Sequence, residues 1–322
     1  MTSDTIFEDL EKYYGFIKEE EISKVFKQVE HVLDASGIQY RVFRRIKKLE
    51  SIKRKMERKS QRYINEGKKM QDILGIRVVL YFIEDIPICI ELFKETFRMV
   101  SMEYDKPDSE TFRPQRINIV FSFPDGSTCV PVEMTDKCLI DNTFELQIRT
   151  IFSEGWHEVE HDVRYKYKND WEDELQMSRD LNGIFAVLEM CDNNMVGILD
   201  NVAYSKYKKR SWEAMMRNRF RLRFTTKPLS STVQKIMDED QNIAKSIFRF
   251  SKVELTRLFR LTNVEITFDN AVFLINAFCL KNRQLEKLMS TDLLKIIQDI
   301  NYHPCEENDE YPYRSIVTTK YV

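Results

Sequence analysis

The feature that most constrains the fold is one nearly continuous apolar stretch in the first third of the chain. Residues 76–82 read IRVVLYF, and most of these side chains are β-branched or aromatic. Such a run predicts a strand buried on both faces, because a half-exposed strand would alternate apolar with polar residues. Alternation or β-branched content predicts four more strands, over residues 38–46, 117–123, 130–134 and 144–148.

Stretches with helical periodicity lie between and after these strands. They predict helices over residues 16–36, 51–65, 88–99, 152–167 and 174–203. Strands mixed with helices predict an α/β (α+β) fold, a mixed β-sheet flanked by helices, followed by a mainly helical C-terminal region. We expect a first domain over residues 1–205, a basic linker over 206–227 and a C-terminal domain over 228–322.

Composition narrows the class of protein. The 322 residues carry a net charge of -2, and the six cysteines include no CxxC pair. The acidic N-terminus does not resemble a signal peptide, and no apolar run has the length needed to cross a bilayer. We therefore expect a cytoplasmic protein with reduced thiols and no membrane partner.

Glycine usage limits how the chain could bind phosphate. There are only eight glycines, and none forms GxGxxG or GxxxxGK[ST]. The dinucleotide-binding turn and the P-loop are therefore excluded. If the protein binds nucleotides, side-chain cations must neutralise the phosphates.

Such cations are concentrated in residues 41–70, which hold thirteen Lys or Arg against three Glu. Two elements present them in order. Arg45 and Lys47 lie two apart at a strand end, so they point to one side. Ser51, Lys55 and Arg58 follow at helical spacing, on one helix face. A solvated basic helix would have the same composition, and only the ordered spacing on two adjoining elements favours an anion site.

Candidate carboxylates follow these cations. Asp72 precedes the strand that carries Arg77, where a turn residue or helix cap is the simple alternative. In residues 144–150, Glu145, Gln147 and Arg149 share the face opposite the apolar residues. A solvent-facing strand would alternate in the same way, but a buried neighbouring strand and a following helix favour a functional face.

The helix after this strand places Glu158, His161 and Tyr165 on one face. His161 and Asp162 could suggest a metal-dependent phosphohydrolase. Only four histidines are present, and none of the others has ligand-like spacing, so we do not favour that class.

Taken in order, these segments resemble the synthetase domain of the RelA/SpoT-homologue family. The matching motifs are Arg45-x-Lys47-x-x-x-Ser51-Ile52-x-x-Lys55-x-x-Arg58, Asp72-Ile73-Leu74-Gly75-Ile76-Arg77, Glu145-x-Gln147-Ile148-Arg149-Thr150, Trp156-x-Glu158-x-x-His161 and Tyr165-Lys166. The resemblance covers roughly residues 15–205 and is to the small, stand-alone type. It implies a nucleotidyltransferase-like fold and Mg²⁺-dependent transfer of the β,γ-pyrophosphate of ATP to the 3′-hydroxyl of GTP or GDP, which gives (p)ppGpp. Small family members also often form homo-oligomers.

The resemblance implies a role for each candidate residue. Arg45 and Arg77 would stack on the two faces of adenine. The ATP phosphates would be held by Lys47, Ser51, Lys55 and Arg58. Asp72 would bind Mg²⁺, and Glu145 would act as base or second metal contact. The acceptor would be bound by Asn118, Gln147, Arg149 and His161.

The sequence departs from the family at the acceptor. Members usually carry Tyr-x-Ser-Leu-His before the middle strand, and its tyrosine stacks on guanine. Here Asn118 takes the histidine position, and only Phe112 could supply a ring. Two other acceptors therefore stay open, an adenosine nucleotide or the 3′ end of tRNA. A catalytically inactive nucleotide-binding regulator is the third alternative.

A basic stretch bears on the tRNA alternative. Residues 204–227 hold nine basic residues against one acid, with Tyr207, Trp212, Phe220 and Phe224 between them. Basic residues interleaved with aromatics suit RNA binding, whereas a basic helix packed on the first domain is the simpler interpretation.

Overall fold

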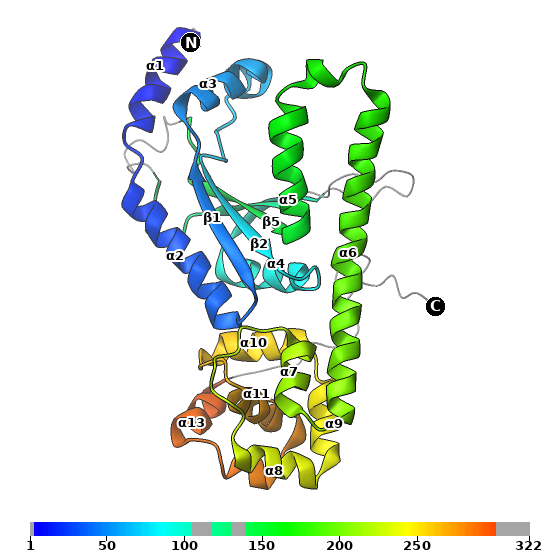
Figure 1. Ribbon diagram of the computed structural model, residues 1–322. Coiled ribbons are helices and arrows are strands. Elements are labelled where there is room, and N and C mark those ends of the chain that lie inside the picture. Colours follow the sequence, from blue (N-terminus) through cyan, green and yellow to red (C-terminus); the bar gives the residue numbers. More distant parts are fainter. Residues whose placement is uncertain (1–2, 105–116, 130–138, 301–322) are drawn as a thin grey trace. The chain divides into compact units, whose positions relative to one another are not determined.

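The computed structural model describes residues 3–104, 117–129 and 139–300 (Figure 1). The chain forms two compact units. The sheet unit contains the described residues of Met1–Glu30, Arg41–Val79 and Phe93–Ala186. The helical unit contains those of His31–Tyr40, Leu80–Leu92 and Val187–Val322. None of the described helices is long and apolar enough to span a membrane.

A five-stranded sheet has the order β1-β2-β5-β4-β3. The strands are β1 (Tyr40–Ile46), β2 (Leu74–Leu80), β3 (Met99–Tyr104), β4 (Ile117–Ser122) and β5 (Thr143–Thr150). β4 pairs antiparallel with β3 and β5. A parallel bridge between Met70 and Ile140 precedes β2 and β5. The sheet is therefore mixed, as predicted.

Four of the five predicted strands are confirmed with shifts of at most two residues at their ends, and the fifth, 130–134, lies outside the described residues. β3 was not predicted. It lies at the sheet edge, and its apolar Met99 and Val100 are exposed, so the sequence shows no buried alternation there. The prediction of helix as far as residue 99 was wrong, because α4 (Asp85–Thr96) ends before this strand.

One face of the sheet is packed with aromatic rings. Phe93 of α4 and Phe97, which directly follows that helix, contact Phe121 of β4, and Phe97 meets Phe144 of β5 edge-on at 5.1 Å between centroids. All four side chains are buried. Burial on this scale is a main source of stability. Because side chains alternate along a strand, this aromatic packing leaves the opposite face of the sheet for polar residues.

Helices around the sheet agree broadly with the periodicity. They are α1 (Ser3–Tyr14), α2 (Glu19–Ser36), α3 (Leu49–Arg58), α5 (Ile151–Val159) and α6 (Leu175–Lys208). The predicted helix 51–65 is α3 followed by a π-helical turn, η1 (Gln61–Asn65). The predicted helix 152–167 is α5 followed by a second π-helical turn, η3 (Glu160–Tyr165). A 3₁₀ turn, η4 (Lys168–Trp171), comes before α6.

The helical unit contains short helices around one apolar core. They are α7 (Trp212–Phe220), α8 (Ser231–Glu239), α9 (Gln241–Arg249), α10 (Lys252–Thr262), α11 (Phe268–Ile275), the π-helical η5 (Asn276–Leu280), α12 (Arg283–Glu286) and α13 (Thr291–Asp299). Most of these helices begin at an N-cap residue whose side chain accepts a hydrogen bond from a backbone N–H of the first turn. These residues are Ser230, Asp240, Ser251, Thr267, Asn282 and Ser290. A mainly helical C-terminal region was predicted and is present.

The segment expected to be a basic linker contributes to this core. Trp212, Met215, Met216 and Phe220 of α7 are buried among the apolar side chains of the other helices. The basic residues of α7 lie on its remaining surface or at its end. The linker and domain boundaries at 205 and 228 therefore stay predictions, while α7 itself packs as part of the helical unit.

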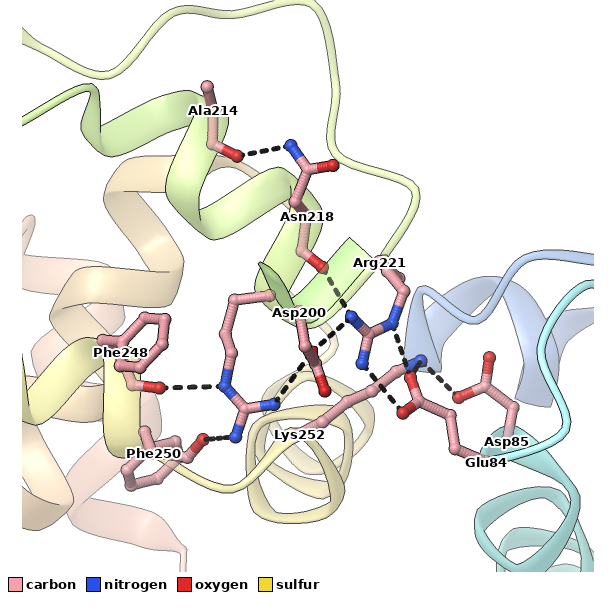
Figure 2. A network of polar contacts seen from close by, with 10 residues as sticks. Glu84, Asp85, Asp200, Ala214, Asn218, Arg221, Phe248, Phe250 and Lys252 are labelled. Carbon is pink, nitrogen blue, oxygen red and sulfur yellow. Dashed lines mark hydrogen bonds and ion pairs between the residues drawn. The ribbon is translucent and has the colours of Figure 1, made fainter. Parts of the chain in front are cut away.

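A buried charge network stabilises the helical unit (Figure 2). Arg221 ends α7 in the left-handed conformation (φ 54°), and its guanidinium lies 2.8 Å from Glu84 Oε1 and 2.8 Å from Asp200 Oδ1. Lys252, at the start of α10, lies 2.7 Å from Glu84 and 2.5 Å from Asp85. The network joins four separate stretches of sequence, and each buried charge in it faces an opposite charge.

Candidate active site

The end of β1, helix α3 and the start of β2 bring two lysines to one carboxylate. Lys55 Nζ lies 2.7 Å from Asp72 Oδ2, and Lys47 donates to the same oxygen. Burial alone would raise the pKa of Asp72, but the two ammonium charges hold that pKa below its ordinary value. Asp72 therefore stays ionised. Its other oxygen, Oδ1, is buried and accepts no hydrogen bond within the described part of the chain.

Glu145 lies on β5 within electrostatic reach of this group. Burial raises the pKa of Glu145, and the negative charge of Asp72 raises it further, although Lys47 opposes the shift. Its backbone partner on β4 is Val120. A carboxylate with a raised pKa holds a proton more strongly than an exposed one, which suits a group that must take a proton.

These carboxylates fit a magnesium ion. Hard carboxylate oxygens are the ligands that Mg²⁺ prefers, and the buried, unbonded Oδ1 of Asp72 is available to one. Among residues 3–104, 117–129 and 139–300, no group of three or more His, Cys, Asp or Glu could hold a metal. Mg²⁺ often takes only one or two protein carboxylates and completes its shell with water and substrate phosphate.

Helix α3 presents the other predicted phosphate-binding residues. Ile52 and Met56 are buried, which fixes the helix and leaves Ser51 and Lys55 half-buried beside that face. Arg58, one turn after Lys55, is exposed. Ser51, Lys55 and Arg58 therefore share one face of α3, as their spacing predicted.

Arg45 and Arg77 lie on one face of β1 and β2. The Lys47 N–H donates to the carbonyl of Ile73 at 2.9 Å, and a Cβ added at Gly75 would lie 3.8 Å from the carbonyl oxygen of Arg45. Arg45 therefore lies opposite Gly75, and Arg77 is two residues further on the same face. Because Gly75 has no side chain, the surface between the two guanidiniums is open on β2.

A second cluster joins β2, β5 and α5. Glu154, in the first turn of α5, lies 2.6 Å from Arg77 Nη1 and 2.8 Å from Arg149 Nη1. Glu158 also pairs with Arg77, and Gln147 accepts a 3.4 Å hydrogen bond from Arg149. Glu154 was missed from the sequence. Its position four residues before Glu158, on the same helix face, was the available signal.

The polar face continues onto β4. Asn118 is the direct cross-strand partner of Gln147, and Glu103 of β3 is the partner of Asn118 on its other side. Directly paired residues in an antiparallel sheet share a face. The predicted acceptor residues Asn118 and Gln147 thus lie side by side, while the predicted ring of Phe112 lies outside the described residues.

The contacts of His161 differ from those of Asn118, Gln147 and Arg149. It is in η3, where its ring stacks on Tyr165 at 5.5 Å and its Nδ1 lies 2.8 Å from Asp162 Oδ1. Its contacts in the described residues are with its own helical segment. The structure therefore brings Asn118, Gln147 and Arg149 together and leaves His161 as a separate prediction.

The model of the region found in RelA/SpoT proteins matches residues 44–170. This part of the chain is similar to the region found in RelA/SpoT proteins. The match begins one residue before Arg45 and ends beyond His161, so every predicted site residue lies inside the RelA/SpoT region.

Individual relatives agree with this assignment. GTP pyrophosphokinase YwaC of Bacillus subtilis (strain 168) is 29% identical over 164 residues, which are 49% of this chain and 72% of YwaC. GTP pyrophosphokinase YjbM of the same organism is 27% identical over 146 residues, which are 45% of this chain and 64% of YjbM. Among solved structures, small alarmone synthetase 1 from Bacillus subtilis is 25% identical with a TM-score of 0.43, over 61% of this chain and 96% of that one. The sequence matches support a transferase of the pyrophosphokinase type.

Proposed function

We propose that the chain transfers the β,γ-pyrophosphate of ATP to the 3′-hydroxyl of GTP or GDP in a Mg²⁺-dependent reaction that gives (p)ppGpp. The observation that carries this proposal is the pairing of Asp72 with both Lys47 and Lys55, beside the buried Glu145. The site contains cations for phosphate and carboxylates for metal. Pyrophosphoryl transfer depends mainly on these, because positioning and charge neutralisation dominate phosphoryl chemistry.

The donor is bound by the basic side of the site. Arg45 and Arg77 are placed to stack on adenine from one face of the sheet, a task that suits planar guanidinium. Lys47, Ser51, Lys55 and Arg58 lie along the path of the phosphates. With ATP bound, the two lysines exchange the carboxylate of Asp72 for phosphate oxygens.

Asp72 and Glu145 would hold Mg²⁺. When bound, the metal neutralises charge that develops on the transferred group. Glu145 also accepts the proton of the acceptor 3′-hydroxyl, since its raised pKa makes it a stronger base than an exposed glutamate. Asn118 and Gln147, paired across β4 and β5, bind the acceptor nucleotide, with Arg149 supporting that wall.

The tRNA alternative depends on free basic residues in 204–227, and several of them are engaged within the chain. Arg219 donates to the carbonyl of Phe248 at 2.8 Å, Arg221 is buried against Glu84, and Arg223 lies 2.8 Å from Asp34. Substituting these arginines would disturb the helical unit as well as any RNA site. Lys208 and Lys209 are exposed and are the appropriate residues for an RNA-binding test.

An acceptor screen tests the proposal. The purified protein is incubated with γ-labelled ATP and Mg²⁺, and GTP, GDP, ATP, ADP or bulk tRNA is added in turn. We expect label on GTP and GDP, and none with Asp72→Ala. Label on tRNA alone, lost in a Lys208→Ala, Lys209→Ala variant, would replace this function with tRNA modification. Label on ADP or ATP would indicate an adenosine alarmone. Nucleotide binding with no labelled product would indicate a regulator.

A further inference from the structure

Glu154 of α5 places one carboxylate oxygen on each of two arginines from neighbouring strands. Its Oε1 lies 2.6 Å from Nη1 of Arg77 on β2, and its Oε2 lies 2.8 Å from Nη1 of Arg149 on β5. β2 and β5 are adjacent in the sheet. One planar carboxylate therefore holds the two guanidiniums in a fixed relation, because each oxygen has a different partner.

The start of α5 fixes the position of Glu154. The helix begins directly after β5, where the Thr150 hydroxyl accepts a 3.1 Å hydrogen bond from the N–H of Ser153. Trp156 is buried, and its indole N–H donates to the carbonyl of Leu181 at 3.1 Å. The carboxylate thus projects from a capped and anchored helix end, so it has little freedom to follow one arginine away from the other.

The charges of this cluster depend on one another. Only 15% of the Glu154 side chain and 7% of the Arg149 side chain are exposed, so solvent screens their ion pair weakly. Burial lowers the pKa of Arg149, and the positive charge of Arg77 lowers it further. The two arginines repel each other, and Glu154 compensates both. A change in the position of one guanidinium therefore alters the electrostatic field at the other.

The cluster lies at the boundary between the two proposed nucleotide subsites. Arg77 belongs to the donor side, on β2. Arg149 belongs to the acceptor side, where it donates a 3.4 Å hydrogen bond to Gln147, the cross-strand partner of Asn118. A series of polar contacts therefore runs from Arg77 through Glu154 and Arg149 to Gln147, across the line where the donor strands meet the acceptor strands.

We infer that Glu154 is a positioning residue that couples the two substrates, so that each nucleotide strengthens the binding of the other. This inference rests on the proposed function. A nucleotide that stacks on Arg77 fixes the Glu154 carboxylate, and this carboxylate then holds Arg149 in place before the second nucleotide arrives. The first nucleotide thus bears the ordering cost of side chains that both nucleotides use, and the second binds more tightly. Such coupling is reciprocal.

Calorimetric titration in Mg²⁺ measures the coupling. The donor is α,β-methylene-ATP, in which carbon replaces the bridging oxygen of the bond that β,γ-pyrophosphate transfer would break, and the acceptor is GDP. For the wild-type protein, the Kd of each nucleotide should fall about fivefold or more when the other is saturating, as is typical of coupled sites. Glu154→Gln keeps the size of the side chain but removes its charge, so this factor should fall to about 1.

Two further variants separate the coupling from stability and from donor binding. Glu154→Asp keeps the charge that compensates the buried arginines, so it tests the coupling even if Glu154→Gln fails to fold. Its shorter side chain should no longer reach both guanidiniums, and the coupling should fall. Glu158→Gln is the matched control. Glu158 forms its own ion pair with Arg77 and is 54% exposed, so its loss should change the affinity for the ATP analogue and leave the coupling factor unchanged.

The outcomes distinguish this inference from the proposed function. Uncoupled binding of both nucleotides to the wild-type protein would overturn the inference alone. Coupling that is retained in both Glu154 variants, or lost equally in Glu158→Gln, would do the same. Binding of the ATP analogue with no binding of GDP or GTP would overturn the proposed acceptor, and the coupling with it.

Discussion

Lys55 and Asp72 are joined by a 2.7 Å contact between Nζ and Oδ2, and Lys47 bonds the same carboxylate oxygen. The two cations thus hold Asp72 in place and compensate its charge before any nucleotide binds. In the proposed reaction, Asp72 would bind the metal and the two lysines would then pair with phosphate oxygens instead of with Asp72. This exchange makes Asp72 the residue whose loss is most informative.

Asp72→Asn should lower kcat/KM for pyrophosphoryl transfer by about a hundredfold or more, as for other single electrostatic contacts to a transition state. The amide keeps the size of the side chain but removes the charge that would bind Mg²⁺. Steady-state kinetics over a Mg²⁺ titration measures the effect, and the Mg²⁺ concentration for half-maximal rate should rise. Asp125→Asn, at an exposed turn, is the matched control. Equal loss in both variants would indicate a general disturbance rather than a metal site.

Glu145 should set the acidic limit of the pH–rate profile. A base must be unprotonated to act, and burial and the charge of Asp72 raise the pKa of Glu145. Activity should therefore decline as the pH falls, beginning above the ordinary glutamate pKa of about 4.3. The measurement is kcat/KM against pH. Glu145→Gln should lose most activity, and its residual rate should no longer decline as the pH falls. If the decline at acidic pH is unchanged in Glu145→Gln, another group accepts the proton.

How far the sequence predicted the site depends on the range of the interactions. Lys47 and Lys55 could be singled out because strand and helix spacing is local, and local periodicity determines which side chains share a face, whereas Asp72 depended on the family resemblance. Glu154 was missed because its role arises only when β2 and α5 meet, 77 residues apart in the case of Arg77. The spacing of four residues from Glu158 indicates a shared helix face but not the distant arginine with which Glu154 pairs.

The same reason limits what composition could predict of the basic segment 204–227. Arg221 appears in the sequence as one of nine cations in a linker, yet it is buried against Glu84, 137 residues earlier. Composition shows that Arg221 adds a positive charge, but not that Glu84 is the residue with which it pairs. The edge strand β3 was missed for a related reason, because its exposed apolar residues break the alternation on which strand prediction depends.

Glu154→Gln should weaken both stability and ATP binding. Arg149 is buried, and its guanidinium would lose a carboxylate partner at 2.8 Å. Breaking a buried ion pair by removing one partner costs about 3 kcal/mol. Arg77 would also lose one of its two carboxylates, so the KM for ATP should rise more than kcat falls. Urea unfolding and steady-state kinetics measure the two effects, with the exposed Glu57→Gln as control. A variant with unchanged stability and an unchanged KM for ATP would show that Glu154 has no role in the site.

Asp85 should make the stability of the protein fall as the pH rises from about 4 to about 7. Complete burial raises the pKa of Asp85 to about 6, despite the nearby Lys252. In this window the folded protein retains a proton that the unfolded chain has lost, so stability is fully present below the ordinary aspartate pKa and is lost through pH 6. At about 1.4 kcal/mol per pKa unit, the loss is about 3 kcal/mol.

Glu84 contributes with the opposite sign. Lys252 and Arg221 outweigh burial and lower its pKa to about 2, so its contribution is lost as the pH falls below about 4.5. The combined contribution of Asp85 and Glu84 to the free energy of unfolding should therefore be highest near pH 4 to 5, and comparing urea titrations of wild type and variants isolates it. Asp85→Asn should flatten the curve above pH 5 and leave the acidic side unchanged, whereas the exposed Asp292→Asn should follow the wild type. If Asp85→Asn retains the wild-type slope between pH 5 and 7, the titrating group lies elsewhere.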